Sequence, residues 1–266
     1  MTLAGAVMII AMAAFCFAGP LFYHGDLSHV NVLLGNRRPG SGHPLGTDAE
    51  GTDVLGRLMA GGRLSLEVGI AAGLLGALMG SLWGAAAGYL GGVADAMMMR
   101  VVDAVIAIPA LVVLLLLTAI YSPSPALLVL VIAATSWLST ARLVRGEALI
   151  LRSREFVQAV RAMGGGRTRA IIRHIAPNAF GTIAVSVSFQ VADAILLLAT
   201  LSYLGLGVRP PSSDWGDMVA SGIGYIYDGY WWEIYPAGLA IVIVVLAFNL
   251  LGDGLRDNLE ARRPPW

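Results

Sequence analysis

The side chains best suited to ionic chemistry with a partner lie in a short polar stretch, residues 153–163, between two long apolar runs. Arg154, Glu155 and Arg161 supply charges of both signs there. In the same stretch, apolar side chains recur at the spacing of one helix face, at Phe156, Ala159, Val160 and Met163. The pattern predicts an amphipathic helix whose polar face is open to ionic contacts.

Three glycines, residues 164–166, end this helix, because glycine holds helical geometry poorly. A second helical stretch is expected at about 168–175, and Pro177 stops it. The sequence therefore predicts two short helices that are joined at a flexible elbow near the membrane surface.

Two functions fit this elbow. A basic interfacial helix can serve only to anchor the chain to anionic lipid. Alternatively, the segment docks a partner protein. The small residues Ala159, Ala162 and Gly164 would then permit close approach, while Glu155 and Arg161 make ionic contacts.

The composition predicts an integral membrane protein. Of 266 residues, 57% are hydrophobic and 13% charged, with a mean hydropathy of +0.76. Lysine is absent, so a phosphate-binding loop that ends in Gly-Lys-Ser/Thr is excluded, as is lysine Schiff-base chemistry. Cys16 is the one cysteine, and its place in an apolar run predicts inert packing.

A spanning helix needs about 20 mostly apolar residues. We expect an all-α membrane domain over residues 1–266, with six spans at 3–23, 64–90, 101–121, 126–143, 179–201 and 236–251. The first segment could also be a signal peptide. No basic residue precedes Arg37, however, which favours a retained span.

The arginines predict the orientation, because cytoplasmic segments carry the excess of positive charge. With the N-terminus inside, the inner segments hold one, eight and three arginines, twelve in all, against five outside. Both termini and the loop 144–178 are therefore expected in the cytoplasm, with outer loops at 24–63 and 202–235. The second outer loop carries aromatic residues expected at the lipid headgroups, namely Trp215, Tyr225, Tyr227, Tyr230, Trp231, Trp232 and Tyr235.

The polar stretch resembles the EAA loop of ABC-importer membrane subunits, a Glu-Ala-Ala pattern followed by a glycine and later a proline. Ala159, Gly164 and Pro177 match, while Gln158 and Val160 replace the Glu and the second Ala. In that family the loop forms a coupling helix that docks on the ATP-binding subunit. The resemblance implies ATPase coupling by Glu155, Phe156, Ala159, Arg161, Ala162, Gly164 and Pro177.

Further motifs at residues 43–66, 201–216 and 249–257 are similar to those of the second, C-type membrane subunit of dipeptide, oligopeptide and nickel importers. The similarity runs from about residue 43 to the end of the chain. Thr52 and Gly56 depart from the usual arginine and serine of the first motif.

This resemblance implies a permease subunit in a bacterial plasma membrane, which forms half of an ATP-driven pathway for di- or oligopeptides. The implied partners are a sibling permease subunit, one or two ATP-binding subunits, an extracytoplasmic substrate-binding protein and the lipid bilayer. No cofactor, metal ion or nucleic acid is expected, and the chain alone should catalyse nothing. Nickel chelates, glutathione and haem stay open as cargo, because selection largely rests with the binding protein.

Gln190 and Asp193 lie three residues apart inside the fifth apolar segment, and therefore on one helix face. An ionisable group at membrane depth usually faces a cavity or a partner. The two residues either line the translocation path, or make structural hydrogen bonds to the sibling subunit or to Ser186 or Ser188.

Three other patterns predict local structure. Glycines every four residues from Gly76 to Gly88 predict close helix packing. Pro109 predicts a kink in the third segment. Asp95, Arg100 and Asp103 predict a solvated cluster of ion pairs at the second cytoplasmic turn.

Two other classes of protein fit the sequence less well. An intramembrane enzyme would need a nucleophile–base pair or clustered acids at one depth, and the apolar segments hold no histidine or lysine. A secondary transporter that works without an ATPase normally shows inverted repeats and more spans, and the sequence has no visible repeat.

Overall fold

The structure, a computed structural model, describes residues 1–23, 31–152, 176–209 and 212–261. The regular elements in these ranges are helices. They are α1 (Thr2–Phe17), α2 (Gly19–Phe22), η1 (Val32–Leu34), α3 (Val54–Leu90), α4 (Gly92–Ile106), α5 (Ala110–Ile120), α6 (Pro125–Arg152), α9 (Ala176–Tyr203), α10 (Trp215–Gly222), η3 (Ile223–Asp228), η4 (Trp231–Glu233) and α11 (Tyr235–Ala261).

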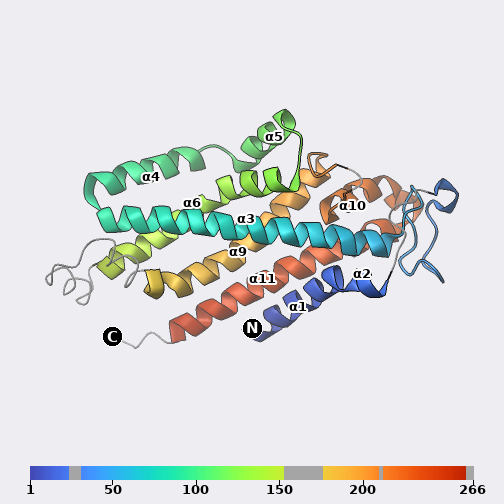
Figure 1. Cartoon of the computed structure of the whole chain (residues 1–266), viewed down its shortest axis with the longest axis horizontal. Helices are drawn as coiled ribbons and strands as arrows, with labels where there is room; N and C mark the ends of the chain where they lie inside the picture. Colours follow the sequence, from blue (N-terminus) through green and yellow to red (C-terminus); the bar gives the residue numbers. More distant parts are fainter. Residues whose placement is uncertain (24–30, 153–175, 210–211, 262–266) are drawn as a thin grey trace.

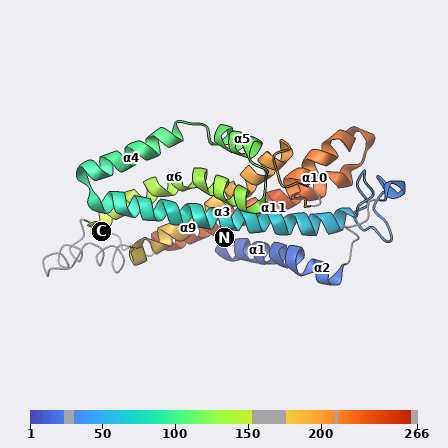
Figure 2. The same ribbon diagram turned by 45° about the horizontal axis from the view of Figure 1, so that its top comes forward.

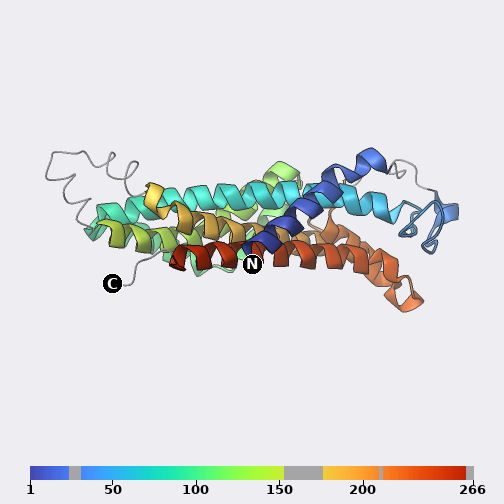
Figure 3. The same ribbon diagram turned by 90° about the horizontal axis from the view of Figure 1, so that it is seen from below.

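The helices form an elongated bundle in which α3 packs against both α6 and α9, and α11 packs against α9 (Figure 1). On one side, α4 and α5 lie over α3 and α6, while α1 lies on the other (Figure 2). Seen from below, α1 crosses α11 and α3 obliquely (Figure 3).

The two ends of the bundle differ. We call the end formed by residues 31–57 and 212–234 the capped end, because short helices and loops gather there. The opposite end, the turn end, holds the α3–α4 turn at Gly91, the end of α6 at Arg152 and the start of α9 at Ala176. The chain that joins α6 to α9 therefore leaves and re-enters the bundle at the turn end.

Four helical stretches among the described residues are long and apolar enough to cross a membrane: α3, α6, Gly181–Tyr203 and Trp231–Leu259. The pair α4 and α5 makes a fifth if it is counted as one span, although it bends by 72°. α1 is a shorter apolar helix of 16 residues. These lengths support an all-α membrane protein.

The bend between α4 and α5 confirms the predicted kink at Pro109, which is the N-cap residue of α5. A proline ring prevents the backbone from continuing the preceding helix, because it removes a hydrogen-bond donor and clashes with the turn before it. The predicted third span, 101–121, is thus two helices at an angle, and its helical part begins earlier, at Gly92.

Several helix boundaries differ from the predicted ranges. α3 begins at Val54, inside the predicted outer loop 24–63, because the Asp53 carboxylate accepts a 2.7 Å bond from the Gly56 backbone and caps the helix. α6 runs to Arg152 and α9 begins at Ala176, so both helices extend into the predicted inner loop 144–178. Pro177 lies in the first turn of α9, where its missing N–H costs no hydrogen bond.

The glycines of α3 confirm the predicted close packing. A Cβ atom on Gly80 would overlap the carbonyl oxygen of Trp137, and one on Gly84 would overlap that of Ala141. Both carbonyls belong to α6, so the backbones of α3 and α6 touch along this ridge. Nearer the capped end, Gly69 and Gly73 make room for side chains of α9 instead.

Candidate functional site

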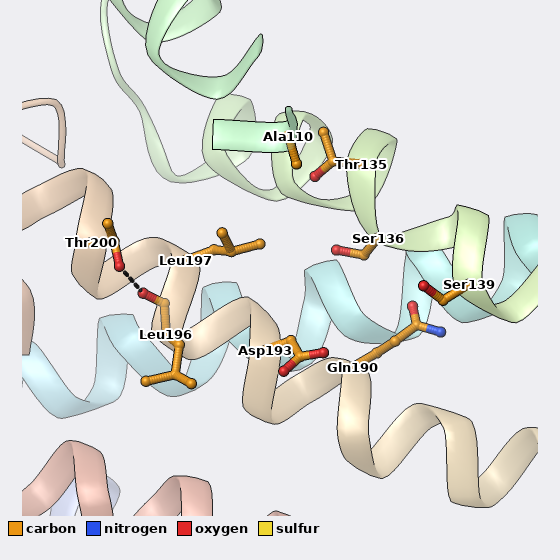
Figure 4. A pocket seen from close by; sticks show the side chains of 9 residues that line it. All are labelled: Ala110, Thr135, Ser136, Ser139, Gln190, Asp193, Leu196, Leu197 and Thr200. Atoms are coloured by element: carbon orange, nitrogen blue, oxygen red, sulfur yellow. Dashed lines mark hydrogen bonds between the residues drawn. The ribbon is translucent and has the colours of Figure 1, made fainter. Parts of the chain in front are cut away.

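A cavity of about 360 Å³ lies between α6 and α9, with α5 at its rim (Figure 4). It is lined by Ala110, Thr135, Ser136, Ser139, Gln190, Asp193, Leu196, Leu197 and Thr200. The structure therefore brings both predicted pathway residues, Gln190 and Asp193, to one polar cavity. The three hydroxyl residues of α6 face them across it.

Gln190 is fixed in place by a network of neutral side chains. Its amide nitrogen donates to the hydroxyls of Thr140 and Ser186, the latter at 3.2 Å, and these two hydroxyls are 2.6 Å apart. The expected structural bond to Ser186 is thus present. Because Thr140 belongs to α6 and Gln190 to α9, this network joins the two helices beside the cavity.

Asp193 differs from Gln190 in its surroundings. Among the described residues it has no hydrogen-bond or ion-pair partner, and its carboxylate points into the cavity (Figure 4). No structural bond to Ser186 or Ser188 holds it, since the Ser188 hydroxyl donates to Ala184 O at 3.2 Å. Asp193 is exposed at the surface of this subunit, and an ionisable group at membrane depth usually faces a cavity or a partner.

The glycine ridge of α3 supports the cavity from behind. A Cβ atom on Gly76 would lie 2.8 Å from Gln190 Oε1 and 3.3 Å from Ser136 Cβ. A larger residue at position 76 would push both lining side chains toward the cavity. The sequence indicated the ridge, but not that it backs the polar site.

At the turn end, two ion pairs join α4 to α6. Arg145 donates to the Asp95 carboxylate from two nitrogens, at 2.5 and 2.7 Å. Arg142 donates to the Asp103 carboxylate at 2.7 Å. The predicted cluster of Asp95, Arg100 and Asp103 is therefore wrong in its partners, because both acids pair with arginines of α6. Contacts between residues 39 and 50 positions apart leave no local signal in the sequence.

Arg152 ends α6 beside the α3–α4 turn. Gly91 adopts φ +65°, and a Cβ atom there would overlap the guanidinium of Arg152. Only glycine leaves room for this arginine at little conformational cost. The last described residue of α6 is thus seated against the turn between α3 and α4.

At the capped end, Arg57 of α3 lies at the centre of a polar cluster. Its guanidinium is 2.5 Å from Asp48, 3.4 Å from Asp217 and 3.2 Å from the Ser213 hydroxyl. Asp48 is 7% exposed at its side chain and Arg57 17%. Arg57 thus contacts both chain segments of the capped end, through Asp48 on one side and Ser213 and Asp217 on the other.

Asp53 anchors the loop before α3. Its carboxylate accepts from the Tyr23 hydroxyl at 2.9 Å and lies 2.8 Å from Nδ1 of His43. Burial, together with the bond to Asp53, raises the pKa of Tyr23 to about 12. His43 is thus part of the loop structure before α3.

Two of the predicted headgroup aromatics are instead buried in the protein. Trp215 and Trp232 are 0% and 2% exposed, and their indole N–H groups donate to Leu58 O at 2.9 Å and Thr47 O at 3.0 Å. The prediction for these two residues is wrong. Inside the protein each indole ring packs against apolar side chains and its N–H has a carbonyl acceptor, so the lipid interface is not required to satisfy either part. Tyr227, by contrast, is 97% exposed.

Asp214 is a buried capping residue that the sequence analysis did not single out. It is fully buried, caps α10 through Gly216 N and Asp217 N, and accepts a 2.5 Å bond from the Ser202 hydroxyl. Burial raises the pKa of this carboxyl above its ordinary value, and the bond from Ser202 opposes the rise. The Asp before an amphipathic turn was a readable N-cap signal.

Most of the predicted coupling residues lie outside the described residues, namely Glu155, Phe156, Ala159, Arg161, Ala162 and Gly164. The backbone of Pro177 is described as part of α9. Among the described residues, no group of three or more His, Cys, Asp or Glu could hold a metal ion.

Comparison with known proteins gives the family. Residues 77–263 match the family described as the binding-protein-dependent transport system inner membrane component. The chain is 38% identical to the oligopeptide transport system permease protein OppC of Bacillus subtilis over 96% of this chain and 83% of that protein. It is 36% identical to the probable D,D-dipeptide transport system permease protein DdpC of Escherichia coli K12, over 98% of this chain and 88% of that protein.

A third relative is the dipeptide transport system permease protein DppC of Bacillus subtilis, 34% identical over 98% of this chain and 82% of that protein. All three matches cover nearly the whole bundle. They confirm the resemblance drawn from the separate motifs. The chain belongs to the family of binding-protein-dependent transport system inner membrane components, and it is a permease subunit of an ABC importer and not an enzyme.

Proposed function

We propose that this chain forms half of the translocation pathway of an ATP-driven importer for di- or oligopeptides. A sibling permease supplies the other half, one or two ATP-binding subunits supply the energy, and an extracytoplasmic binding protein delivers the cargo. The observation that carries the proposal is the polar cavity between α6 and α9, two helices that are joined through residues 153–175 at the turn end.

Within this proposal, the chain spans the bacterial plasma membrane six times. α1 is the first span, and the bent pair α4 and α5 is the third. Both termini are in the cytoplasm, and so is the turn end. The capped end then faces the binding protein, and its buried cluster around Arg57 keeps the receiving surface rigid.

The coupling segment has the residues Glu155, Phe156, Ala159, Arg161, Ala162, Gly164 and Pro177. They transmit closure of the ATPase to α6 and α9. A displacement of this segment is transmitted to α4 through the Asp95–Arg145 pair. It is transmitted to α3 through the packing of Arg152 on Gly91. Gln190 and Asp193 line the path that opens alternately to the two sides.

A peptide cargo is supported by the relatives, which are an oligopeptide and a dipeptide transport system permease protein. Nickel chelates, glutathione and haem are the alternative cargoes. Uptake of labelled dipeptide, tripeptide, nickel chelate, glutathione and haem into vesicles that hold the complete importer would decide among them. Uptake of one of the last three, with none of either peptide, would overturn the peptide assignment.

Docking is tested by cross-linking. Ala162→Cys should cross-link to the ATP-binding subunit in membranes, whereas Ser221→Cys, at the exposed capped end, should not. The native thiol does not interfere, because Cys16 is fully buried. Equal cross-linking from both sites would contradict the proposal. Uptake that persists without the ATP-binding subunit would instead favour a secondary transporter.

A further inference from the structure

The cavity between α6 and α9 presents hydrogen-bond acceptors and few donors. The hydroxyls of Thr135 and Ser136 both donate to Ile132 O, at 2.9 and 2.8 Å, and that of Thr200 donates to Leu196 O at 2.8 Å. A hydroxyl that has committed its proton to a backbone carbonyl offers lone pairs to its surroundings. These three lining side chains therefore act as acceptors toward anything in the cavity.

Asp193 has the same character, whereas the Gln190 carbonyl oxygen is buried behind the cavity, against Gly76. The amide nitrogen of Gln190 is already bound to Thr140 and Ser186, while its carbonyl oxygen has no partner among the described residues. Gln190 is only 5% exposed, so this oxygen is a buried acceptor without a donor. Ionised Asp193 adds two more acceptor oxygens and a negative charge.

Among the described residues that line the cavity, no positive charge balances that carboxylate. Among the nine described residues that line the cavity, Asp193 is the one acid and none is basic. A charge at membrane depth is strongly disfavoured unless an opposite charge or a set of hydrogen bonds compensates it. Asp193 is exposed on this subunit, so compensation comes from its surroundings, namely water, the sibling subunit or a bound molecule. Of these, a bound cationic molecule supplies a full opposite charge.

We propose that this cavity binds the cationic nitrogen group of the transported molecule, an ammonium or a guanidinium. The inference rests on the proposed function, because it takes the cavity to be part of the path. An ammonium group brings one positive charge and up to three N–H donors, and a guanidinium brings five. A volume of about 360 Å³ accommodates such a group with part of the molecule that carries it.

Binding of a cationic group is tested by measuring peptide uptake into vesicles that hold the complete importer, either wild type or with Asp193→Asn. The cargoes are trialanine, N-acetyl-trialanine and an N-acetylated tripeptide with a central arginine. For each peptide, the ratio of variant to wild-type uptake cancels the preference of the binding protein. We expect uptake of trialanine and of the arginine peptide to fall about tenfold, and that of N-acetyl-trialanine less than about twofold.

A matched control removes a carboxylate elsewhere. Asp228→Asn alters an exposed acid of η3 at the capped end and should leave the three ratios equal to one another. Asp193→Glu should restore selective uptake of the cationic peptides. Ratios that fall together for charged and uncharged peptides, or do not fall at all, overturn the cation site.

A second measurement needs no cargo. In Ser139→Cys, at the cavity, a cationic aminoethyl methanethiosulfonate should react about tenfold faster, relative to the neutral methyl reagent, than in Ser139→Cys/Asp193→Asn. The same relative rate in both variants overturns the inference.

The outcomes separate this inference from the proposed function. If the assembled importer takes up no peptide, the proposed function fails. If peptides enter but Asp193→Asn is not selective, only the cation site fails. Uptake that requires sodium, and stops when choline replaces it, would assign the cavity to an inorganic cation and overturn the cargo assignment.

Discussion

At the capped end, Arg57 pairs with Asp48, and these two side chains are only 17% and 7% exposed. Arg57 also reaches Ser213 and Asp217, 156 and 160 positions away in the chain, although Asp217 is 39% exposed. At the turn end, Arg142 and Asp103 are each about half exposed, and the tighter Arg145–Asp95 pair is still reached by solvent from the arginine side. Buried polar networks lock one arrangement, whereas exposed pairs exchange with water at little cost. We therefore expect the buried Arg57–Asp48 pair to hold one arrangement more firmly than the exposed Arg142–Asp103 pair.

The largest expected effect breaks the capped end. Arg57→Ala leaves Asp48 buried without its partner and should reduce the free energy of unfolding by about 3 kcal/mol. Thermal unfolding of the purified chain in detergent measures this. Arg63→Ala is the matched control on the same helix, because Arg63 is 62% exposed and its ion pair is with Glu67, also exposed; it otherwise lies 5.5 Å over the Phe17 ring. Equal losses for the two variants would contradict the contrast.

A smaller loss is expected when one indole hydrogen bond of the capped end is removed. Trp232→Phe keeps the aromatic packing but leaves Thr47 O, in a buried residue, without its donor. The free energy of unfolding should fall by about 1–2 kcal/mol. Tyr227→Phe, at an exposed position, should change it by less than about 0.5 kcal/mol. Thermal unfolding of both variants tests the difference.

At the turn end, Arg145→Ala should reduce stability by about 1 kcal/mol, because the pair with Asp95 is only partly buried. Its larger effect should be on coupling, since the pair joins α4 to the helix that leads into residues 153–175. In the complete importer, we expect less peptide transported per ATP hydrolysed. An unchanged ratio of peptide uptake to ATP hydrolysis would show that the Arg145–Asp95 pair does not contribute to coupling.

The smallest effect is expected at the exposed pair. Arg142→Ala should lower stability by less than about 0.5 kcal/mol, because both partners are about half in solvent. Raising the salt concentration should reduce even that difference. A loss as large as that of Arg145→Ala would mean that the two turn-end pairs act as one unit.

The elements and the cavity residues were predictable to different degrees. The apolar runs and Pro109 predicted the long helices and the bend, because hydropathy and proline geometry are local properties. The spacing of Gln190 and Asp193 placed both on one face of α9, which the cavity confirms. The opposite wall, with Thr135, Ser136 and Ser139, had no signal, because it depends on how α6 meets α9.

Other contacts were missed for the same reason. Nothing near Asp95 in the sequence points to Arg145, and nothing near Trp232 points to Thr47, 185 positions away. The start of α3 is a different case. Asp53 directly before a helical run was a readable capping signal, and it would have moved the predicted boundary from residue 64 to Val54.

The length of α3 has a consequence for the height of the protein above the lipid. Its 37 residues extend about 55 Å, whereas the hydrocarbon layer is about 30 Å thick. Arg63 and Glu67 mark where the helix leaves that layer, since residues 68–90 hold no charge and alone extend about 35 Å. The first four turns of α3, about 20 Å long, thus extend beyond the hydrocarbon layer and hold the loops above the headgroups. A protein that arrives from the aqueous side can meet them without touching the bilayer.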